Sequence, residues 1–576
     1  MAFCLSVWPA QAQEFYLKII PVDSGRAETK SFRQRPELWR YLHEQQWRLQ
    51  EKGYLACSVD SVREKDSVVT AWLFTGKKYR WAKIDFSGVP MGLWDRLDIA
   101  RRNWQDKPIS PAKLAALHEA VLNYCDNNGY PFAYTYLDSF QERESGLSAE
   151  FHLVTGPLQK IDTIIVQGDV DIALPYLENY LDIFQGGLYD ESALRQIRKR
   201  LDELPFLQEN QPWRMDFSID KNRLYLYLKP KKANQANALL GLQPNTQASG
   251  KFMLTADVLL GLKNSLGYGE TIEASYKNLS YKSPLFQAHV IAPYILGTRF
   301  GMEGRFDLYK QDTTYRKITF EAGMRYQFSA DNYFRVFYQN VGNRLITADT
   351  HYVSVNRKLP GNIDMKSQGM GMTYATDFTD YKLNPHRGWS AEITVTGAVR
   401  TVIPNDAILE MGNFSRYDYQ QLYDQANVEK YQFRFMGAAA WYCPVTRSII
   451  AKAGYQGGYI YGKNLFQNEL FQIGGFHSLR GFDENSLYAS QYHIASFEIH
   501  FEFGKNDFFY VFNDDAMVWT RFQDYQKKDY PLSLGAGLSL ENKTGVFNIA
   551  LGVGKHYQGQ FQLRNAKIHF GYAAYF

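Results

Sequence analysis

The chain lacks any long apolar run and any surplus of one charge. Its 576 residues hold 64 Lys and Arg against 60 Asp and Glu, a net charge of +4. No stretch of about 18 apolar residues occurs, which excludes a transmembrane helix on length. A charge so close to balance argues against a dedicated nucleic-acid-binding protein, which normally carries a strong basic surplus.

Patterns that mark catalytic and metal sites are missing as well. The eleven histidines contain no H-E-x-x-H pair, and no Gly-x-Ser-x-Gly nucleophile elbow occurs. Gly457–Asn464 differs at one position from the Gly-x4-Gly-Lys-Ser/Thr pattern of a phosphate-binding loop. The differing residue, Asn464, lacks the hydroxyl group that would bind Mg²⁺. The cysteines lie far apart without a C-x-x-C pair, at Cys4, Cys57, Cys125 and Cys443. We therefore expect no enzyme, no cofactor and no metal site.

Aromatic residues, in contrast, are abundant. They make up 16% of the chain, with 41 Tyr and 38 Phe, beside 43 Gly. High Tyr, Phe and Gly content without a spanning helix is typical of a membrane β-barrel, whose apolar residues occupy every second position.

The first residues resemble an export signal. Within Met1–Gln13 a short apolar stretch ends at Ala10-Gln11-Ala12, a small-x-small site of the kind that signal peptidase cuts. We predict that residues 1–12 are a signal peptide without its basic start; a disordered leader is the alternative.

Three segments of the N-terminal half repeat one order of elements. Each begins with a strand-like run, continues through helical stretches and ends with two further strand-like runs. Gly53 and Gly129 lie 76 residues apart, and Gly88 and Gly168 lie 80 apart. Equal spacing of like elements indicates a module array. We predict three small α+β modules of the order β-α-α-β-β at residues 13–78, 79–158 and 159–233. Their sheet edges could accept strands from other chains; three domains without a partner are the alternative.

A period of two begins near residue 234 and continues to the last residue. In Ile494–Phe503, for example, Phe497 and Ile499 share one face while Glu498 and His500 share the other. About sixteen such segments fill residues 234–576, and a closed barrel of even strand number leaves no edge unpaired in lipid. We therefore predict a transmembrane β-barrel of about 16 antiparallel strands, with long extracellular connections such as Ala348–Lys366 and Pro404–Tyr431. A soluble sandwich, which also alternates, is the alternative.

One motif makes the assignment specific. Gly474–Phe482 reads GGFHSLRGF, which resembles the Gly-Gly…Ser-Leu-Arg-Gly-Phe/Tyr loop of outer-membrane assembly and translocation proteins of the BamA/TamA superfamily. FNDDAMVW (Phe512–Trp519) is similar to an acidic strand of that family, although Asp515 replaces the usual Ala and Ala516 the usual Gly. The family's strand-start motif is matched by Pro385, Arg387 and Gly388. The last strand resembles the β-signal of bacterial outer-membrane proteins, with Ile568, Phe570, Tyr572 and Phe576 on one face.

The resemblance implies three POTRA domains before a sixteen-stranded barrel, and a loop that folds into the barrel lumen. The loop motif comprises Gly474, Gly475, Ser478, Leu479, Arg480, Gly481 and Phe482. Because a buried arginine must be paired, we predict that Arg480 bonds to Glu498, whose phase points inward, to Asp514, whose phase is ambiguous, or to both. Gly481 would allow a sharp turn, and Phe482 would pack against the wall. A structural plug and a part in client handling both fit.

The resemblance also implies location, function and partners. We expect the barrel in the bacterial outer membrane and the N-terminal domains in the periplasm. The protein would insert client proteins or translocate them, at a weak seam between the first strand (near Ala236–Gln243) and the last (Asn565–Phe576). Implied partners are outer-membrane lipid, unfolded outer-membrane or secreted proteins, and an inner-membrane or periplasmic partner; no nucleic acid is expected.

Two other functions remain open. One is a two-partner-type secretion pore for one exported protein, a class that usually has two POTRA domains rather than three. The other is a solute channel, which would leave the N-terminal half unexplained.

Overall fold

The computed structural model describes residues 14–576 except 24, 91–103, 145, 245–251, 279–282, 330–331, 382–383, 416, 477, 505, 543–544 and 575–576. The predicted signal peptide at residues 1–12 therefore lies outside the described residues. The chain forms two compact units. The first holds the described residues up to Thr163 with Gln185–Arg195 and Phe217–Arg223, and the second holds Ile164–Phe184, Gln196–Asp216 and Leu224–Phe576. No helix among the described residues is both long enough and apolar enough to span a membrane.

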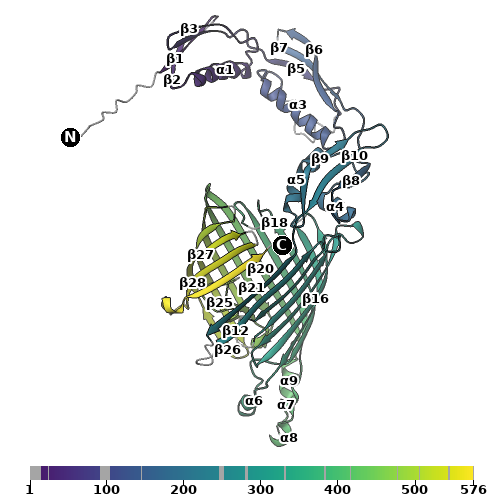
Figure 1. Ribbon diagram of the computed structural model, residues 1–576, viewed down its shortest axis with the longest axis vertical. Coiled ribbons are helices and arrows are strands. Elements are labelled where there is room, and N and C mark those ends of the chain that lie inside the picture. Colours follow the sequence, from purple (N-terminus) through teal and green to yellow (C-terminus); the bar gives the residue numbers. More distant parts are fainter. Residues whose placement is uncertain are drawn as a thin grey trace, which may run out of the picture. The chain divides into compact units, whose positions relative to one another are not determined.

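The first module is a four-stranded sheet covered by one helix (Figure 1). Its elements are β1 (Phe15–Pro21), β2 (Glu28–Phe32), α1 (Arg35–Glu51), β3 (Ser58–Lys65) and β4 (Val68–Phe74), in the sheet order β2-β1-β4-β3. Leu38 and Leu42 of α1 are buried against Leu17 and Val69 of the sheet. The sequence did not predict β2, and the predicted order β-α-α-β-β is β-β-α-β-β in this module.

The second and third modules are three-stranded. The second contains β5 (Trp81–Asp85), α3 (Pro111–Asp126), β6 (Tyr134–Arg143) and β7 (Gly146–Val154), in the order β5-β7-β6. The helix α3 starts where expected because Ser110 caps it, accepting a hydrogen bond from the Lys113 amide at 3.2 Å, and Pro111 follows. The repeated order β-α-α-β-β also predicts a helix before α3, and most of the chain between β5 and α3, residues 91–103, lies outside the described residues. The third contains β8 (Thr163–Gln167), α4 (Leu174–Leu181), α5 (Glu191–Glu203), β9 (Leu207–Asp216) and β10 (Arg223–Pro230), in the order β8-β10-β9.

The same hydrogen-bonded joint links successive modules. The amide of Tyr79 donates to the carbonyl of Gly53 at 2.7 Å, and 80 residues later the amide of Gln159 donates to the carbonyl of Gly129, also at 2.7 Å. A side chain at the end of the helix then accepts from an amide at the start of a helix in the following module. Glu51 accepts from the Ala112 amide at 2.7 Å, and Asn127 from the Ser192 amide at 2.9 Å. Gly53 and Gly129 therefore occupy corresponding positions in their two modules.

Glycine is required at Gly53 for two reasons. Its φ of +98° is unfavourable for other residues, and a Cβ there would lie 2.6 Å from the Tyr79 carbonyl oxygen of the next module. Gly186 offers a matched comparison, because its φ is +77° but no atom lies within 4 Å of a Cβ added there.

We expect Gly53→Ala to open the joint between the first two modules. Positive φ costs an L-residue roughly 1–3 kcal/mol, and the clash adds to this. Limited proteolysis of the full-length protein in detergent should therefore cleave between these modules at least about tenfold faster than in wild type. Gly186→Ala carries only the conformational cost and should change cleavage much less. Equal rates for the two variants would show that the close approach does not matter.

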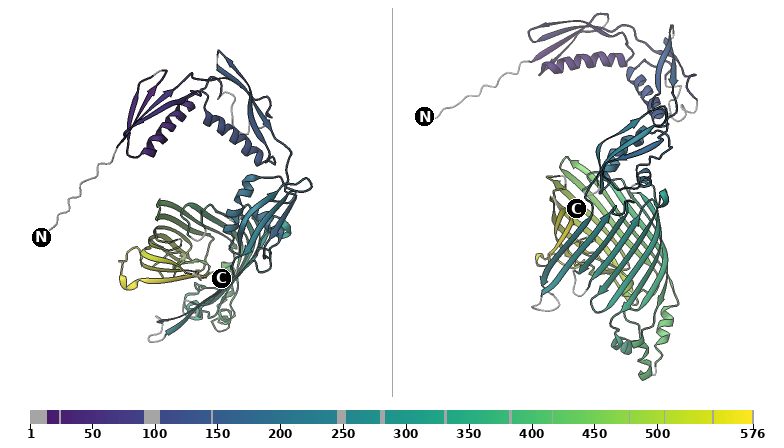
Figure 2. Two further views of the ribbon diagram at one scale, coloured as in Figure 1. Left: turned by 45° about the horizontal axis from the view of Figure 1, so that its top comes forward. Right: turned by 45° about the vertical axis from the view of Figure 1, so that its right-hand side comes forward.

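The C-terminal region is a sheet of strands that pair antiparallel in chain order (Figures 1 and 2). The strands are β11 (Gln235–Pro244), β12 (Phe252–Lys263), β13 (Thr271–Asn278), β14 (Leu285–Ala292), β15 (Phe300–Gln311), β16 (Tyr315–Gln327), β17 (Tyr333–Leu345), β18 (Met365–Asp377), β19 (Gly388–Val402), β20 (Tyr431–Thr446), β21 (Ile449–Tyr461), β24 (Gln491–Glu502), β25 (Phe508–Phe522), β26 (Tyr525–Asp529), β27 (Leu532–Asn542), β28 (Gly545–Lys555) and β29 (Lys567–Ala574).

Two of these 17 strands are halves of one. Both β26 and β27 pair with β25, and Pro531 separates them. Proline has no amide hydrogen for the ladder, so it interrupts the strand. Sixteen barrel strands result, and the predicted fold class, a transmembrane β-barrel behind small α+β domains, is confirmed.

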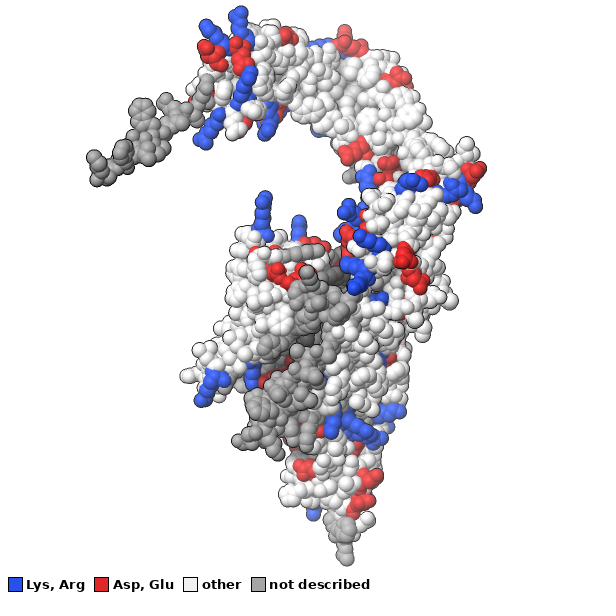
Figure 3. Space-filling view, viewed as in Figure 1, with Lys and Arg blue, Asp and Glu red and all other residues white. Residues whose placement is uncertain are grey.

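The barrel wall alternates as predicted. On β24, Phe497, Ile499 and Phe501 are exposed on the outer face, while Glu498 and His500 are buried on the inner one. Figure 3 shows a flank of the barrel that is largely free of charged side chains, with Lys, Arg, Asp and Glu gathered toward its two ends. An apolar outer belt with a polar interior is the arrangement that lipid requires.

Long connections at one end of the barrel fold into a small helical cap. It contains α6 (Thr350–Asn356), α7 (Asp406–Leu409), α8 (Gly412–Ser415) and α9 (Gln420–Ala426) (Figure 1). Val353, Ile408 and Tyr423 are fully buried in its core, and burial raises the pKa of Tyr423 to about 12. The connections predicted at Ala348–Lys366 and Pro404–Tyr431 are thus folded rather than open loops.

The third module's helix α4 docks on tight turns of the barrel. Asn179 donates to the Gly297 carbonyl at 3.0 Å, and Asp182 pairs with Arg299. A Cβ at Gly269 would lie 2.0 Å from the ring of Tyr176. These contacts fix α4 beside the β12–β13 and β14–β15 turns of the barrel.

The two end strands meet without a ladder. Strands β11 and β29 approach within 8 Å between Cα atoms. Within the described residues, however, the sheet runs from β11 to β29 and no backbone pairing joins these ends. This seam is therefore the one place in the described barrel where the wall lacks hydrogen bonds between neighbouring strands.

Candidate functional site in the barrel lumen

The loop between β21 and β24 folds back as a short ribbon with a tight tip. Strands β22 (Phe471–Ile473) and β23 (Leu487–Ala489) pair antiparallel and carry the tip between them. Gly474 and Gly475 adopt φ of +113° and +98°, which other residues rarely do. The Gly474 amide donates to the Ser478 hydroxyl at 2.8 Å, and the Gly475 amide donates to the Leu479 carbonyl at 3.1 Å. The tip thus has a defined shape that presents Arg480.

Arg480 is held by two carboxylates from the wall. Its Nε and Nη2 donate to Asp514 Oδ2 and Oδ1 at 2.9 and 2.6 Å, and its backbone amide donates to the same Oδ2 at 3.1 Å. Its Nη1 lies 3.0 Å from Glu498 Oε1. The side chain of Asp514 is 0% exposed. A bidentate pair of this kind fixes the guanidinium in orientation as well as position.

Glu498 is shared with two further side chains. Lys452 Nζ lies 3.1 Å from Glu498 Oε1, and His500 Nε2 lies 2.9 Å from Oε2. Lys452 is the direct cross-strand neighbour of Glu498 on β21. Sequence reasoning missed both residues, and the pairing register of β21 with β24 is the signal that would have found Lys452.

Aromatic side chains inside the lumen explain why the phase of Asp514 was ambiguous. On β25, Tyr510 and Phe512 are buried on the same face as Asp514. The guanidinium of Arg480 stacks over the Phe512 ring, 3.8 Å from its centroid. Asp515 faces outward and is exposed, accepting a hydrogen bond from Asn513 at 2.8 Å. The unusual Asp515 therefore does not disturb the lumen, whereas the buried Ala516 contacts the loop core.

The tip packs closely onto the wall where the facing residues are glycines. A Cβ at Gly481 would lie 2.7 Å from the Gly554 amide nitrogen, and one at Gly552 would lie 2.8 Å from the Gly481 nitrogen. Gly552 and Gly554 lie on β28, and the sequence did not single them out. Phe482 and Leu479 are buried in a cluster that includes Ile494 and Val518 of the wall.

The strand-start motif forms a closed turn between β18 and β19. Strand β19 begins at Gly388, whose φ is +112°. Asp380 accepts from the amides of His386 and Arg387 at 2.9 and 3.1 Å. Burial alone would raise the pKa of Asp380, but these amides hold it below its usual value. The side chain of Arg387 is not drawn into the Arg480 cluster, whereas Pro385 and Arg480 line one cavity.

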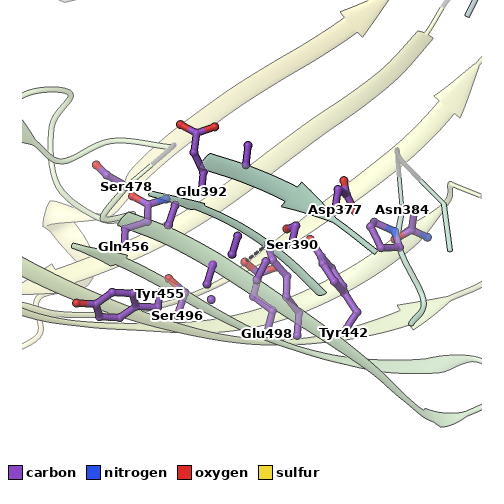
Figure 4. A pocket seen from close by; sticks show the side chains of 18 of the residues that line it. Asp377, Asn384, Ser390, Glu392, Tyr442, Tyr455, Gln456, Ser478, Ser496 and Glu498 are labelled. Atoms are coloured by element: carbon purple, nitrogen blue, oxygen red, sulfur yellow. Dashed lines mark hydrogen bonds and ion pairs between the residues drawn. The ribbon is translucent and has the colours of Figure 1, made fainter. Parts of the chain in front are cut away.

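That cavity has a volume of about 690 Å³. Its lining combines acidic, basic and hydroxyl side chains, and Figure 4 shows several of them around one space. They include Asp377, Glu392, Lys452, Arg480, Glu498 and His500. The loop tip is thus one wall of a polar chamber inside the barrel.

The predicted β-signal falls mostly where side chains are not described. Ile568, Phe570 and Tyr572 lie on β29, and Ile568 is 60% exposed on the outside. Phe576 lies outside the described residues.

Comparison with known proteins identifies the family. The Omp85 superfamily domain matches residues 264–576, more than half of the chain. The chain belongs to the Omp85 superfamily. Membership supports a general role in the insertion of proteins into the outer membrane or their translocation across it, and an outer-membrane location for the barrel. The resemblance to the BamA/TamA superfamily is thereby confirmed. No curated protein sequence matches the chain.

Two solved structures of CdiB share the fold at low sequence identity. CdiB from Escherichia coli is 14% identical with a TM-score of 0.54, covering 94% of this chain and 97% of that one. CdiB from Acinetobacter baumannii is 13% identical with a TM-score of 0.50, covering 90% and 93%. BamA from Haemophilus ducreyi lacking POTRA domains 1–3 is 16% identical with a TM-score of 0.47, covering 85% and 98%.

We expect Arg480→Ala to weaken the folded barrel markedly. The substitution leaves the fully buried Asp514 without its partner, and an unmatched buried charge costs about 3–5 kcal/mol. The temperature at which the folded band disappears in SDS gel electrophoresis should therefore fall. Arg521→Ala, on the exposed face of the same strand, is the control and should melt like wild type. Identical melting of the Arg480 and Arg521 variants would contradict the pairing argument.

Proposed function

We propose that this Omp85 protein inserts client proteins into the outer membrane through the seam between β11 and β29. The observation that carries the proposal is a difference between the seam and the rest of the wall. Neighbouring strands of the described barrel are joined by fifteen antiparallel hydrogen-bonded ladders, whereas no such ladder joins β11 to β29. Unpaired backbone N–H and C=O groups along a strand edge are costly in lipid. A client strand can pair with these groups by adding to the edge.

The lumen loop lies close to this seam. Its tip rests on Gly552 and Gly554 of β28, the strand next to β29. Asp483, three residues beyond Arg480, pairs with Lys567 of β29 at 2.6 Å. This pair is partly exposed and contributes little stability, so the loop can contact the last strand without locking it. We infer that Arg480 holds the loop while the seam strands move.

The N-terminal modules would receive clients before insertion. Each contains a sheet with exposed edges, and we place them in the periplasm as POTRA domains. The edge strand β6 of the second module exposes Tyr134, Tyr136 and Phe140. Backbone pairing to such an edge, supported by aromatic side chains, suits an extended client. An inner-membrane or periplasmic partner could use the same edges.

No chemical energy source is part of this proposal. Burial of apolar client strands in lipid and new backbone hydrogen bonds drive insertion. We accordingly propose that the protein is not an enzyme and needs no cofactor.

A secretion pore for one exported protein is the second candidate. The polar chamber of about 690 Å³ favours it, because a translocated chain needs a wet path. Against it stands the bonding at the barrel mouth, where Gln523 of the β25–β26 turn donates to the Leu359 carbonyl of the β17–β18 connection at 2.8 Å. A solute channel would face the same obstruction and would leave the modules without a role.

We expect a covalent bond across the seam to abolish client insertion. Cysteines introduced in Gln235–Pro244 and Lys567–Ala574 should form a disulfide, since these strands approach closely. The purified protein in liposomes would be given an unfolded outer-membrane protein, and protease-resistant client would be measured before and after reduction. Reduction should restore insertion severalfold.

Single-cysteine variants of the same strands control for the mutations themselves. Full insertion by the oxidised double variant would rule out the seam as the route. If oxidised protein instead released client into the liposome lumen, the secretion pore would be the better account.

A further inference from the structure

A second buried ion pair holds the same loop at its beginning. The segment Asn464–Leu470, here called the mouth segment, leads from β21 into the loop at the end of the barrel that carries the helical cap. Glu469 lies in this segment, and its Oε2 accepts from Arg400 Nη1 of β19 at 3.0 Å. The two side chains are 0% and 3% exposed. The lumen motif does not include Glu469, and it lies eleven residues from Arg480.

Every oxygen of the Glu469 carboxylate is used. Oε1 accepts from Gln432 Nε2 of β20 at 2.9 Å, and Oε2 also accepts from the Phe466 amide at 2.7 Å. The backbone carbonyl of Glu469 accepts from Arg434 Nη2 at 2.6 Å. A carboxylate so fully bonded, with a charged partner, is a fixed point rather than a solvated lumen residue.

The rest of the mouth segment is tied to other elements. Arg400 also donates to the Asn464 carbonyl at 3.0 Å, and the Gln467 amide donates to the Gly361 carbonyl at 2.7 Å. Asn468 Nδ2 donates to the Ile363 carbonyl at 2.8 Å. The mouth segment therefore bridges β19, β20 and the connection that follows α6.

Phe466 joins the mouth segment to the cap. Its ring is buried in the same cluster as Val353 of α6, Ile408 of α7 and Tyr423 of α9. Displacement of the mouth segment would pull this ring out of the cap core. The cap and the loop are thus coupled through one short stretch of chain, in which Glu469 makes the buried ion pair.

We propose that Glu469 is a positioning residue that keeps the barrel mouth closed. Its pairing with Arg400 fixes the mouth segment against the wall. The Leu465 carbonyl of this segment accepts from the Gln523 amide at 3.0 Å, and Gln523 Nε2 donates to the Leu359 carbonyl at 2.8 Å. The mouth segment is thus part of a set of bonds that joins the β25–β26 turn to the β17–β18 connection across the mouth. The role concerns closure of the lumen toward the outside and is independent of how clients are handled.

An exposed ion pair at the same mouth provides a matched control. Lys463 Nζ lies 2.7 Å from Glu429 Oε1, and both side chains are exposed. Loss of this pair removes a carboxylate of equal charge from the same region without unpairing a buried group.

The test measures conductance of the full-length protein in planar bilayers beside the fraction of folded barrel in SDS gels. We expect Glu469→Ala to raise the open probability at least about tenfold at an unchanged folded fraction. Glu469→Gln keeps the shape of the side chain and one acceptor oxygen but loses the charge and the second acceptor, so its open probability should be intermediate. Glu429→Gln should match wild type.

A double variant separates pairing from general damage. Arg400→Met leaves Glu469 buried and unpaired, so it should open the mouth strongly. Adding Glu469→Gln to Arg400→Met removes the stranded charge and should lower the open probability again. Wild-type conductance in Glu469→Ala and Glu469→Gln, or a double variant more open than Arg400→Met, would overturn the proposal. If the alanine variant does not fold, the glutamine variant and the double variant decide.

Discussion

A barrel in lipid can carry its charges on one face only, and every charge buried on that face needs a partner. The lumen of this protein follows that constraint at three places. Arg480 pairs with Asp514 and Glu498, Arg400 pairs with Glu469, and Arg325 and Arg335 pair with Glu303. The first two groups join the loop to the wall, and the third joins the consecutive strands β15, β16 and β17. The inward-folded loop depends on two of the three, so its position is a consequence of charge burial as much as of chain connectivity.

The outer face of the barrel and its strand number could be predicted from the sequence, because lipid imposes a period of two on every strand. Arg480 could be identified from its motif, and the need for a buried partner directed attention to Glu498. Lys452 could not be identified from the sequence, because cross-strand neighbours depend on the pairing register, which alternation alone does not fix. Asp514 was ambiguous because Tyr510 and Phe512 place apolar rings inside the lumen, which breaks the simple rule of polar inside and apolar outside.

Glu469 illustrates the same limit more sharply. Nothing near it in sequence marks it as buried, because its partners come from β19 and β20, more than thirty residues away. The short strand β2 of the first module was missed for a different reason. Its residues Glu28–Phe32 are mostly polar and exposed, so the sequence has no apolar alternation that would indicate an edge strand. The sequence thus predicts features that lipid imposes on every strand. It does not predict contacts between residues that are far apart in the sequence and are brought together only by the fold.

The distribution of bonds around the barrel bears on how it works. Near the mouth, a buried ion pair, side-chain hydrogen bonds and an aromatic ring hold the mouth segment to the wall and the cap. At the seam, the described end strands approach each other without a ladder, and the adjoining loop contact, Asp483 with Lys567, is partly exposed. Opening the mouth would strand buried charges, whereas parting the seam would break few bonds that water or a client strand cannot replace. Under the proposed function, the less costly movement is therefore lateral, which favours insertion of client strands sideways into lipid over their passage outward through the bore.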